Sequence, residues 1–526
     1  MVNAIAIVVI ALIWLYGWHV GRMWTRSCGV RERGSLWALA CVFPTAGLAM
    51  AVQLAAIAET VTGRVLIGPA QVAVAFLLLC RVGKGVVEGQ QHQSVRTLRP
   101  RVASPPGISL KWLWAPVLVV GLAYAVFLAD AITGPVTGAR PQPASPPQVA
   151  WWTGDAAAEV VPDPPRASVP ESGEVATFLL ASAGLERCGP VTRLLDAVLL
   201  AAVIHALARS LGAGTRAAAV AVCITLSVPV VLVQSFAPGA DLYAAAAWLS
   251  SLLAMVWAMR VEHDRQRRNL LVLAGLAAGA GVGSGWGRLA AAALLVLIVL
   301  AEGWLRPQEF RTAAPRPLRN MVLFCVVGLL CSGCWLADGL ARTGGRRLRP
   351  ESVVAAAPSS FAEPSPDAGV TLSILRRRIA SWWDYPWREP RGIENGSTAA
   401  TGAAYATFVP IGLAAAVFSF AGRRFGNPTE RWKLVYVTIA CGGLLLALVL
   451  PRVAVRDTLA QVLLLIPVAA VLIDRLMVRF PRSVLLTLTA ALVMTVTITA
   501  REPARAVAER VRDAGWHSSP VAVTRR

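Results

Sequence analysis

Two carboxylates spaced four residues apart follow a pair of tryptophans in VAWWTGDAAAEVV, residues 149–161. At this spacing Asp155 and Glu159 would share one face of a helix, and tryptophans favour the boundary between membrane and water. A carboxylate held at that depth could take a proton from an acceptor hydroxyl group. Asp155 is therefore a candidate general base, with Glu159 and Asp163 as alternates. A solvated acidic loop explains the same residues without chemistry, and the sequence leaves both interpretations open.

A further candidate carboxylate, Asp241, stands where an apolar helix begins in SFAPGADLYAAAAW. A carboxylate in the first turn stabilises a helix through its dipole, so capping alone explains this residue. Gln234 and Ser235 lie close before it, however, and three polar side chains at the end of an apolar segment fit a site for a ligand headgroup. Asp241 is thus a candidate for both roles.

Five arginines are candidates for binding the phosphate of a lipid carrier. Guanidinium groups bind phosphate oxygens, and the neighbouring stretch WWDYPWREPRGIENG, residues 382–396, carries tryptophans that seat a loop at headgroup depth. Ordinary phospholipid headgroups would satisfy these arginines equally well. The five are Arg376, Arg377, Arg378, Arg452 and Arg456.

The rest of the chain indicates what must position these residues. Of its 526 residues, 56% are hydrophobic and 15% are charged, and the mean hydropathy is +0.60. A soluble core of this length cannot absorb so much apolar surface, whereas runs of about 18–25 apolar residues can cross a bilayer as helices. We therefore expect an all-α polytopic membrane protein with about 14 transmembrane helices and two long extracytoplasmic loops.

The distribution of arginines predicts on which side of the membrane each loop between the expected spans lies. Placing basic clusters such as MRVEHDRQRRN, residues 259–269, in the cytoplasm puts the N-terminus and the loops 134–191 and 342–402 outside. The net charge of +21 is then explained by cytoplasmic loops and anionic lipids, and we expect no nucleic acid partner. The expected spans are 3–21, 35–57, 65–81, 112–133, 192–209, 216–236, 241–259, 269–283, 289–305, 319–341, 403–421, 432–450, 457–474 and 483–500.

These spans divide the chain into three parts. Residues 1–111 form a three-helix extension with a basic cytoplasmic loop, 112–475 form the core with both outer loops, and 476–526 hold the last span and a basic tail. The first span lacks the charged region and cleavage site of a signal peptide, so we expect it to be retained. The glycine-rich stretch 269–305 predicts a hairpin of two spans packed through glycine and alanine.

No metal motif is evident. The cysteines of FCVVGLLCSGCW (Cys325, Cys331 and Cys334) sit in an apolar helix, which favours packing over metal ligation. His205, in AAVIHALARS, is expected to bond between helices. We expect no resident cofactor, and the requirement for a divalent metal stays open.

The order of these features resembles the GT-C superfamily of membrane glycosyltransferases, which includes protein O-mannosyltransferases and lipid A aminoarabinose transferases. The resemblance covers about residues 112–475 and includes the glycine-rich LVLAGLAAGAGVGSGWGRLAAAALL. It implies a transferase that takes a sugar from a polyprenyl-phosphate carrier and passes it to an extracytoplasmic lipid, glycan or protein. It also implies a bacterial inner (plasma) membrane, an extracytoplasmic active face, and Asp155 in the loop where the family keeps an essential aspartate. The residues that fit a loose family pattern are Pro229, Gln234, Ser235, Asp241, Ala245 and Trp248.

The chain also departs from the family. Its first outer loop reads GDAAAEVVPDPPR without the family's Tyr-His, and the usual lysine after the glycine-rich run is replaced by Trp286 or Arg288. A non-catalytic membrane protein of the same fold is therefore a second hypothesis, and a transporter or flippase is a third. The first hypothesis requires the outer-loop carboxylates, the second does not, and the third requires charges at mid-membrane.

Overall fold

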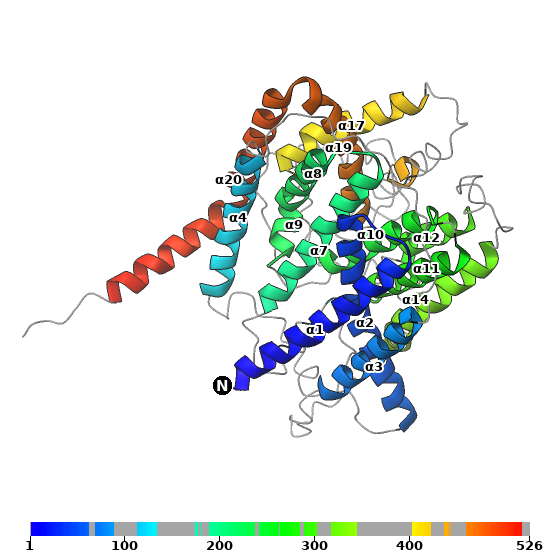
Figure 1. The fold of residues 1–526 in the computed structure, drawn as a ribbon. Coiled ribbons are helices and arrows are strands. Elements are labelled where there is room, and N and C mark those ends of the chain that lie inside the picture. Colours follow the sequence, from blue (N-terminus) through cyan, green and yellow to red (C-terminus); the bar gives the residue numbers. More distant parts are fainter. Residues whose placement is uncertain are drawn as a thin grey trace, which may run out of the picture.

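A computed structural model describes most of the apolar segments of the chain. The described residues are 2–62, 69–88, 113–133, 173, 175–176, 180, 189–236, 241–261, 263–284, 289–301, 317–343, 402–421, 436–440, 442 and 459–517. Within these ranges every regular element is a helix and none is a strand (Figure 1). The all-α prediction is confirmed for this part of the chain.

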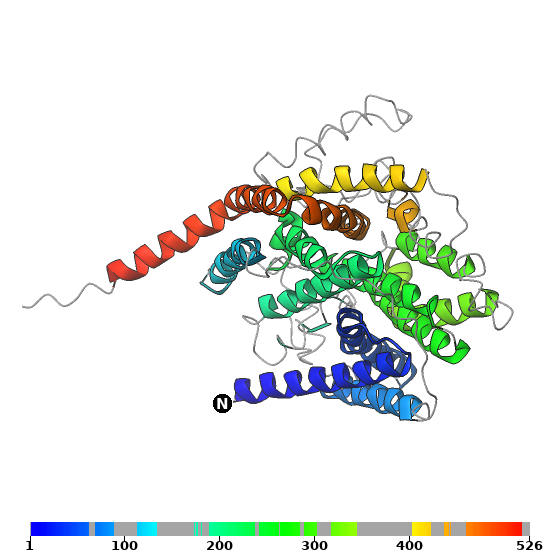
Figure 2. The same cartoon turned by 45° about the horizontal axis from the view of Figure 1, so that its top comes forward.

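The first three helices pack together as a unit. They are α1 (Val2–Ser27), α2 (Arg33–Thr62) and α3 (Pro69–Glu88), close to the predicted spans. Figure 2 shows α1 and α3 side by side along one side of the molecule, opposite the yellow helix α17 (Gly402–Ala421). The unit is held by apolar contacts.

Helix α10 (Asp241–Ala258) is the centre of the bundle. Every residue from Leu242 to Ala258 is buried, and a helix that is buried on all sides belongs to the interior of a large helical protein. Its neighbours include α2, α7 (Gly189–Ser210), α11 (Asp264–Val282) and α19 (Leu459–Arg479). Asp241 therefore stands at the end of the most enclosed helix.

The glycine-rich stretch forms two helices, α11 and α12 (Leu289–Leu300), as predicted. Two glycines of α11, Gly275 and Gly279, however, face α14 (Pro317–Thr343) rather than α12. A Cβ added to Gly275 would lie 2.8 Å from the carbonyl oxygen of Phe324, and one added to Gly279 would lie under 3.0 Å from that of Gly328. Small residues at these positions let the two backbones approach closely, so the predicted partner of the glycine face was wrong.

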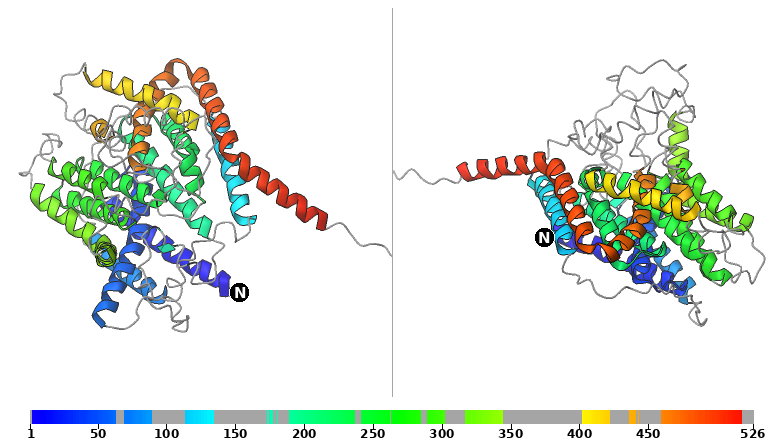
Figure 3. Two further views of the ribbon diagram at one scale, coloured as in Figure 1. Left: turned by 180° about the vertical axis from the view of Figure 1, so that it is seen from behind. Right: turned by 90° about the horizontal axis from the view of Figure 1, so that it is seen from above.

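Two predicted spans differ from the structure in extent. The segment 216–236 contains two helices, α8 (Thr215–Ser227) and α9 (Pro229–Gln234), because a proline restricts the residue before it and ends the helix there. The last helix, α20 (Pro481–His517), continues well beyond the predicted end at 500. It lies beside α4 (Trp114–Thr133), and its red C-terminal part projects from the bundle in Figure 3.

Six helices of the described part are long and apolar enough to cross a membrane. Large apolar side chains on them face outward, including Leu118, Leu122 and Leu486, as expected for surfaces that contact lipid. The chain is therefore a membrane protein. The six segments are Arg33–Leu54, Trp114–Ala131, Val191–Ser210, Asp241–Ala258, Leu459–Arg479 and Pro481–Arg501.

The relative directions of neighbouring helices agree with the predicted alternation. Helices α17 and α19 run parallel, since Tyr405 Oη donates to the carbonyl oxygen of Val462 at 2.8 Å and Gly412 lies against Ala469 further along. Helices α11 and α14 are also parallel, whereas α10 and α11 are antiparallel, with Gly281 beside Ala244. The bundle thus has two ends, which we call the Asp241 end and the Arg260 end.

Candidate functional site

Asp241 is the predicted site residue that lies within the described part of the chain. It begins α10 and is its acidic first-turn residue, which places its carboxylate where the helix dipole favours negative charge. This is the position that the helix-dipole interpretation of Asp241 requires, and its role as a ligand-binding residue stays a prediction. The other predicted site residues lie outside the described residues: Asp155, Glu159, Arg376, Arg377, Arg378, Arg452 and Arg456.

The structure brings together part of the predicted polar group around Asp241. Gln234 Nε2 donates to Asp241 Oδ2 at 3.4 Å, which joins the end of α9 to the start of α10. Ser235 does not share this contact. Its hydroxyl donates to the carbonyl oxygen of Val231 at 2.7 Å and lies 3.1 Å from the hydroxyl of Tyr124 on α4. Ser235 therefore fixes the position of α9, and Gln234 orients the carboxylate.

Phe236 anchors the same turn against two other helices. Its ring stacks on Phe127, with centroids 5.8 Å apart, and lies 5.6 Å from the ring of Tyr124. Arg193 Nη1, near the start of α7, donates to the carbonyl oxygen of Phe236 at 3.3 Å. The peptide before Asp241 is thereby held between α4 and α7.

Sequence reasoning missed Asp196 and Tyr243 at this end. Asp196 is half-buried in α7, and the hydroxyl of Tyr243, in the first turn of α10, is buried. Arg193 lies three residues earlier, on the same face of α7. A signal was present in the run LLDAVLLAAVIHAL, where Asp196 interrupts an apolar segment, because ionisable residues inside spans mark functional sites.

The predicted site residues outside the described part belong to segments that adjoin the Asp241 end. Segment 134–188 runs from Thr133 of α4 to α7, segment 344–401 runs from α14 to Gly402 of α17, and the residues before Leu459 lead into α19. All these helix termini lie at the Asp241 end, as the helix directions require. The described helix termini that border these segments therefore share one end of the bundle.

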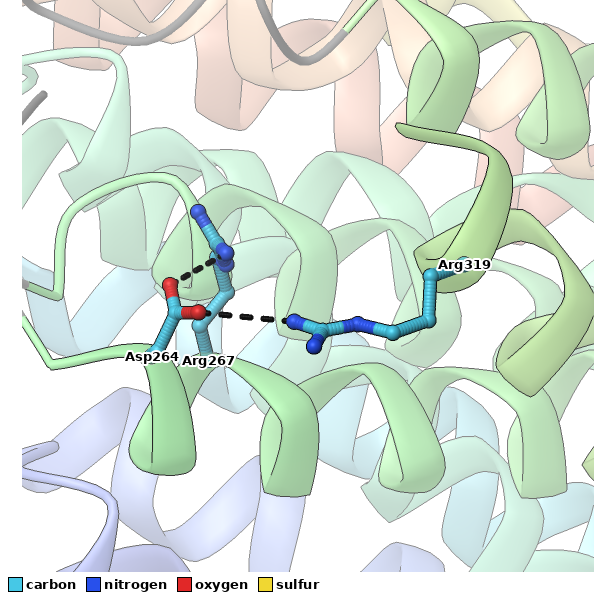
Figure 4. Close-up of polar contacts among 3 residues, drawn as sticks. All are labelled: Asp264, Arg267 and Arg319. Atoms are coloured by element: carbon cyan, nitrogen blue, oxygen red, sulfur yellow. Dashed lines mark hydrogen bonds and ion pairs between the residues drawn. The ribbon is translucent and has the colours of Figure 1, made fainter. Parts of the chain in front are cut away.

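The Arg260 end holds a second charged group with a structural role. Asp264, in the first turn of α11, pairs with Arg267 of its own helix and with Arg319 of α14, whose Nη2 lies 3.4 Å from Asp264 Oδ2 (Figure 4). The Arg267 side chain is only 1% exposed, so its charge requires this carboxylate. Asp264 therefore ties the start of α14 to the start of α11.

Arg260 completes the contacts at this end. Its Nη2 donates to the carbonyl oxygen of Ser210 at 2.8 Å, and the guanidinium lies 5.8 Å from the centre of the Trp257 ring. Burial lowers the pKa of Arg260 to about 10, and the Glu32 carboxylate opposes the shift, so the group stays charged at neutral pH. His205 of α7 lies against Gly34 at the start of α2, so it faces another helix, and its hydrogen bond between helices stays a prediction.

The described residues contain no group of three or more His, Cys, Asp or Glu side chains that could hold a metal ion. Cys331 is buried, and its Sγ lies 3.8 Å from the carbonyl oxygen of Ala46 on α2, in agreement with a packing role. Comparison with protein-family models, with curated proteins and with solved structures finds no match for this chain.

Proposed function

We propose that this chain is an integral membrane glycosyltransferase of GT-C type, with about 14 spans. It moves a sugar from a polyprenyl-phosphate carrier to a lipid, glycan or protein on the extracytoplasmic side of a bacterial inner membrane. One observation carries the proposal. Asp241 lies at the same end of the bundle as the helix termini that border every segment with a predicted carboxylate or arginine.

The charge distribution supports an extracytoplasmic Asp241 end. The opposite end is strongly basic, and basic residues accumulate on the cytoplasmic side of membrane proteins. Its described carboxylates are Glu32, Glu88, Asp264 and Asp474. Its described basic residues are Arg22, Arg26, Arg31, Arg33, Arg81, Lys84, Arg209, Arg216, Arg260, Arg265, Arg267, Arg268, Arg319, Arg475, Arg479 and Arg482.

The proposed reaction requires little covalent chemistry by the protein's own side chains. The leaving group is a phosphate that is already ionised, so the main tasks are to position the two substrates and to stabilise charge. In the proposal, the five arginines Arg376–378, Arg452 and Arg456 bind the carrier phosphate, Asp155 or Glu159 accepts the acceptor proton, and Asp241 orients the donor headgroup. Apolar helices supply a surface for the polyprenyl chain.

The full chain, purified and reconstituted in lipid vesicles, provides the test. Transfer of radiolabelled sugar from undecaprenyl-phosphate carriers to envelope lipids and glycans is compared for wild type, Asp155→Asn and Asp241→Asn. Loss of a general base lowers a rate by about 10²–10⁴-fold, so we expect Asp155→Asn to show that loss. Asp474→Asn, at the Arg260 end, is the matched control and should transfer at the wild-type rate. Absence of transfer by the wild type with every carrier would overturn the proposal.

A further inference from the structure

The last helix, α20, continues past the end of its apolar part. Its candidate span Pro481–Arg501 has 21 residues, which at 1.5 Å per residue makes about 32 Å, enough to cross the hydrocarbon of a bilayer. Arg501 therefore lies near the depth of the lipid headgroups. The helix nevertheless continues to His517, and we call residues 502–517 the C-terminal arm.

Two features keep the arm close to this depth. Pro503 follows the end of the span by two residues, and a proline inside a helix kinks it; the red part of α20 leaves the bundle at an angle to the rest of the helix (Figures 1 and 3). Further along the arm, Arg510 Nη1 donates to Asp130 Oδ1 at 2.9 Å and to the carbonyl oxygen of the same residue at 3.1 Å. Asp130 is the next-to-last residue of the span Trp114–Ala131 of α4, so the ion pair holds the arm where that span also ends.

An exposed apolar row runs along the arm. Ala504, Ala508 and Val511 are exposed, and their spacing of four and three residues places them on one face of the helix. Val511 is 65% exposed, whereas Arg510 turns toward α4. An apolar row in water contributes nothing to stability, but beside a bilayer it can be removed from water.

An exposed basic row lies next to the apolar one. Arg501, Arg505 and Arg512 are exposed, and their spacing of four and seven residues puts them on one face. Glu509, which pairs with Arg505 at 3.1 Å, lies on the side of the basic row that is away from the apolar row. Apolar, basic and acidic side chains thus follow one another around the helix. This is the order expected for a helix lying in the membrane surface, because arginines at the border of the apolar face reach the lipid phosphates.

We propose that the C-terminal arm lies in the membrane surface and binds anionic phospholipids of the leaflet at the Asp241 end. The apolar row enters the boundary between headgroups and acyl chains, the basic row binds phosphates, and Glu509 faces water. The partner is the bilayer rather than a second protein, because the arm leaves a membrane-spanning helix at headgroup depth and is tied to the end of α4. This docking requires neither the proposed transferase activity nor a particular choice of leaflet.

Photo-crosslinking of the full chain in nanodiscs tests the docking. The photoreactive amino acid p-benzoylphenylalanine is introduced at Val511 or, as the matched control, at Glu509. The nanodiscs contain phosphatidylcholine alone or an equal mixture of phosphatidylcholine and phosphatidylglycerol, and mass spectrometry measures the lipid adducts. We expect adducts at position 511, more of them in the mixed nanodiscs than in phosphatidylcholine alone, and few at position 509.

A pair of double variants tests the basic row. A basic residue close to an anionic membrane surface strengthens binding about 5-fold. Arg501→Gln with Arg512→Gln should therefore weaken docking about 25-fold and lower the adduct yield at position 511 toward that in phosphatidylcholine alone. Arg265→Gln with Arg268→Gln is the matched control, because it removes two exposed arginines of α11 at the Arg260 end. It should leave the adducts at position 511 unchanged.

Three results would contradict the docking. Position 511 could give no lipid adduct in the mixed nanodiscs, either because the arm extends into water or because it crosslinks to a second protein chain. Equal lipid adducts at positions 511 and 509 would mean that the arm presents no preferred face to the bilayer. Adducts that neither phosphatidylglycerol nor the loss of Arg501 and Arg512 changes would overturn the role of the basic row. None of these measurements uses a sugar carrier, so the docking and the proposed function can fail separately.

Discussion

Replacing Gly279 with alanine should destabilise the protein through a single methyl group. A Cβ at this position would lie under 3.0 Å from the carbonyl oxygen of Gly328 and 2.8 Å from Cys331 Cβ, and ordinary contacts of this kind begin near 3.4 Å. Backbone atoms of α14 cannot rotate away, so α11 and α14 must separate. Separation also loosens the contact at Gly275. Overpacking of this kind costs about 1–3 kcal/mol, and it outweighs the helix propensity of alanine, which contributes about 1 kcal/mol.

Gly333 is the matched control, because a Cβ there would meet nothing within 4 Å. Gly333→Ala lies in the same helical environment of α14 and should stabilise the protein by up to about 1 kcal/mol, through propensity alone. Thermal unfolding of both variants in the same detergent measures the difference. The packing argument is refuted if Gly279→Ala is as stable as wild type or more stable, since α11 and α14 would then tolerate a Cβ between their backbones.

Three other predictions follow from the sequence and the structure. Cysteines engineered at Ser145 and Ser365 should react with a membrane-impermeant maleimide in intact spheroplasts, and protection of both would reverse the proposed orientation. Burial raises the pKa of the Cys28 thiol from 9.0 to about 12, so the folded state holds this proton more tightly than the unfolded state, and the stability that this contributes should be lost as the pH rises from 9 to 12. Cys28→Ala should therefore show a smaller loss of unfolding free energy over that pH range. Identical pH profiles for wild type and variant would contradict the prediction. Exchanging Arg376, Arg377 and Arg378, or Arg452 and Arg456, for glutamine should weaken binding of undecaprenyl phosphate. We expect little change in melting temperature, because these arginines are predicted to face the water outside the membrane, where charges contribute little to stability. Unchanged affinity in both variants would remove the arginines from the phosphate site.

The helices were predictable from sequence where the length of an apolar run and the polar residues at its ends define them. The apolar runs that became α10 and α19 are long enough to cross a membrane and are bounded by polar residues, so their ends fall within a few residues of the prediction. The break at Val228 was readable from Pro229 but was passed over, since the apolar run continues through it. The extension of α20 past residue 500 was missed because it is polar: hydropathy detects the membrane-spanning part of a helix and not its continuation in water.

The candidate site was predictable only in part. Asp241 and Gln234 are close in sequence, and their contact follows from a short connection between two helices. Arg193 and Phe236 are far apart in sequence, and their hydrogen bond depends on a relative placement of α7 and α9 that no local pattern reveals. The sequence likewise contained the glycines of α11 without indicating that α14, rather than the adjacent α12, packs on them.

The sequence by itself determined that the chain is a membrane protein, that its described elements are helices, and that neighbouring helices alternate in direction. These depend on the length and polarity of each segment, because a backbone in hydrocarbon must satisfy its hydrogen bonds within a helix. Only the tertiary structure decided that α10 is the enclosed helix, that Arg267 is buried against Asp264, and that Arg193 bonds to the carbonyl oxygen of Phe236. These features depend on the close fit of side chains and backbones between helices, which apolar composition alone does not specify, since lipid and protein are equally apolar neighbours.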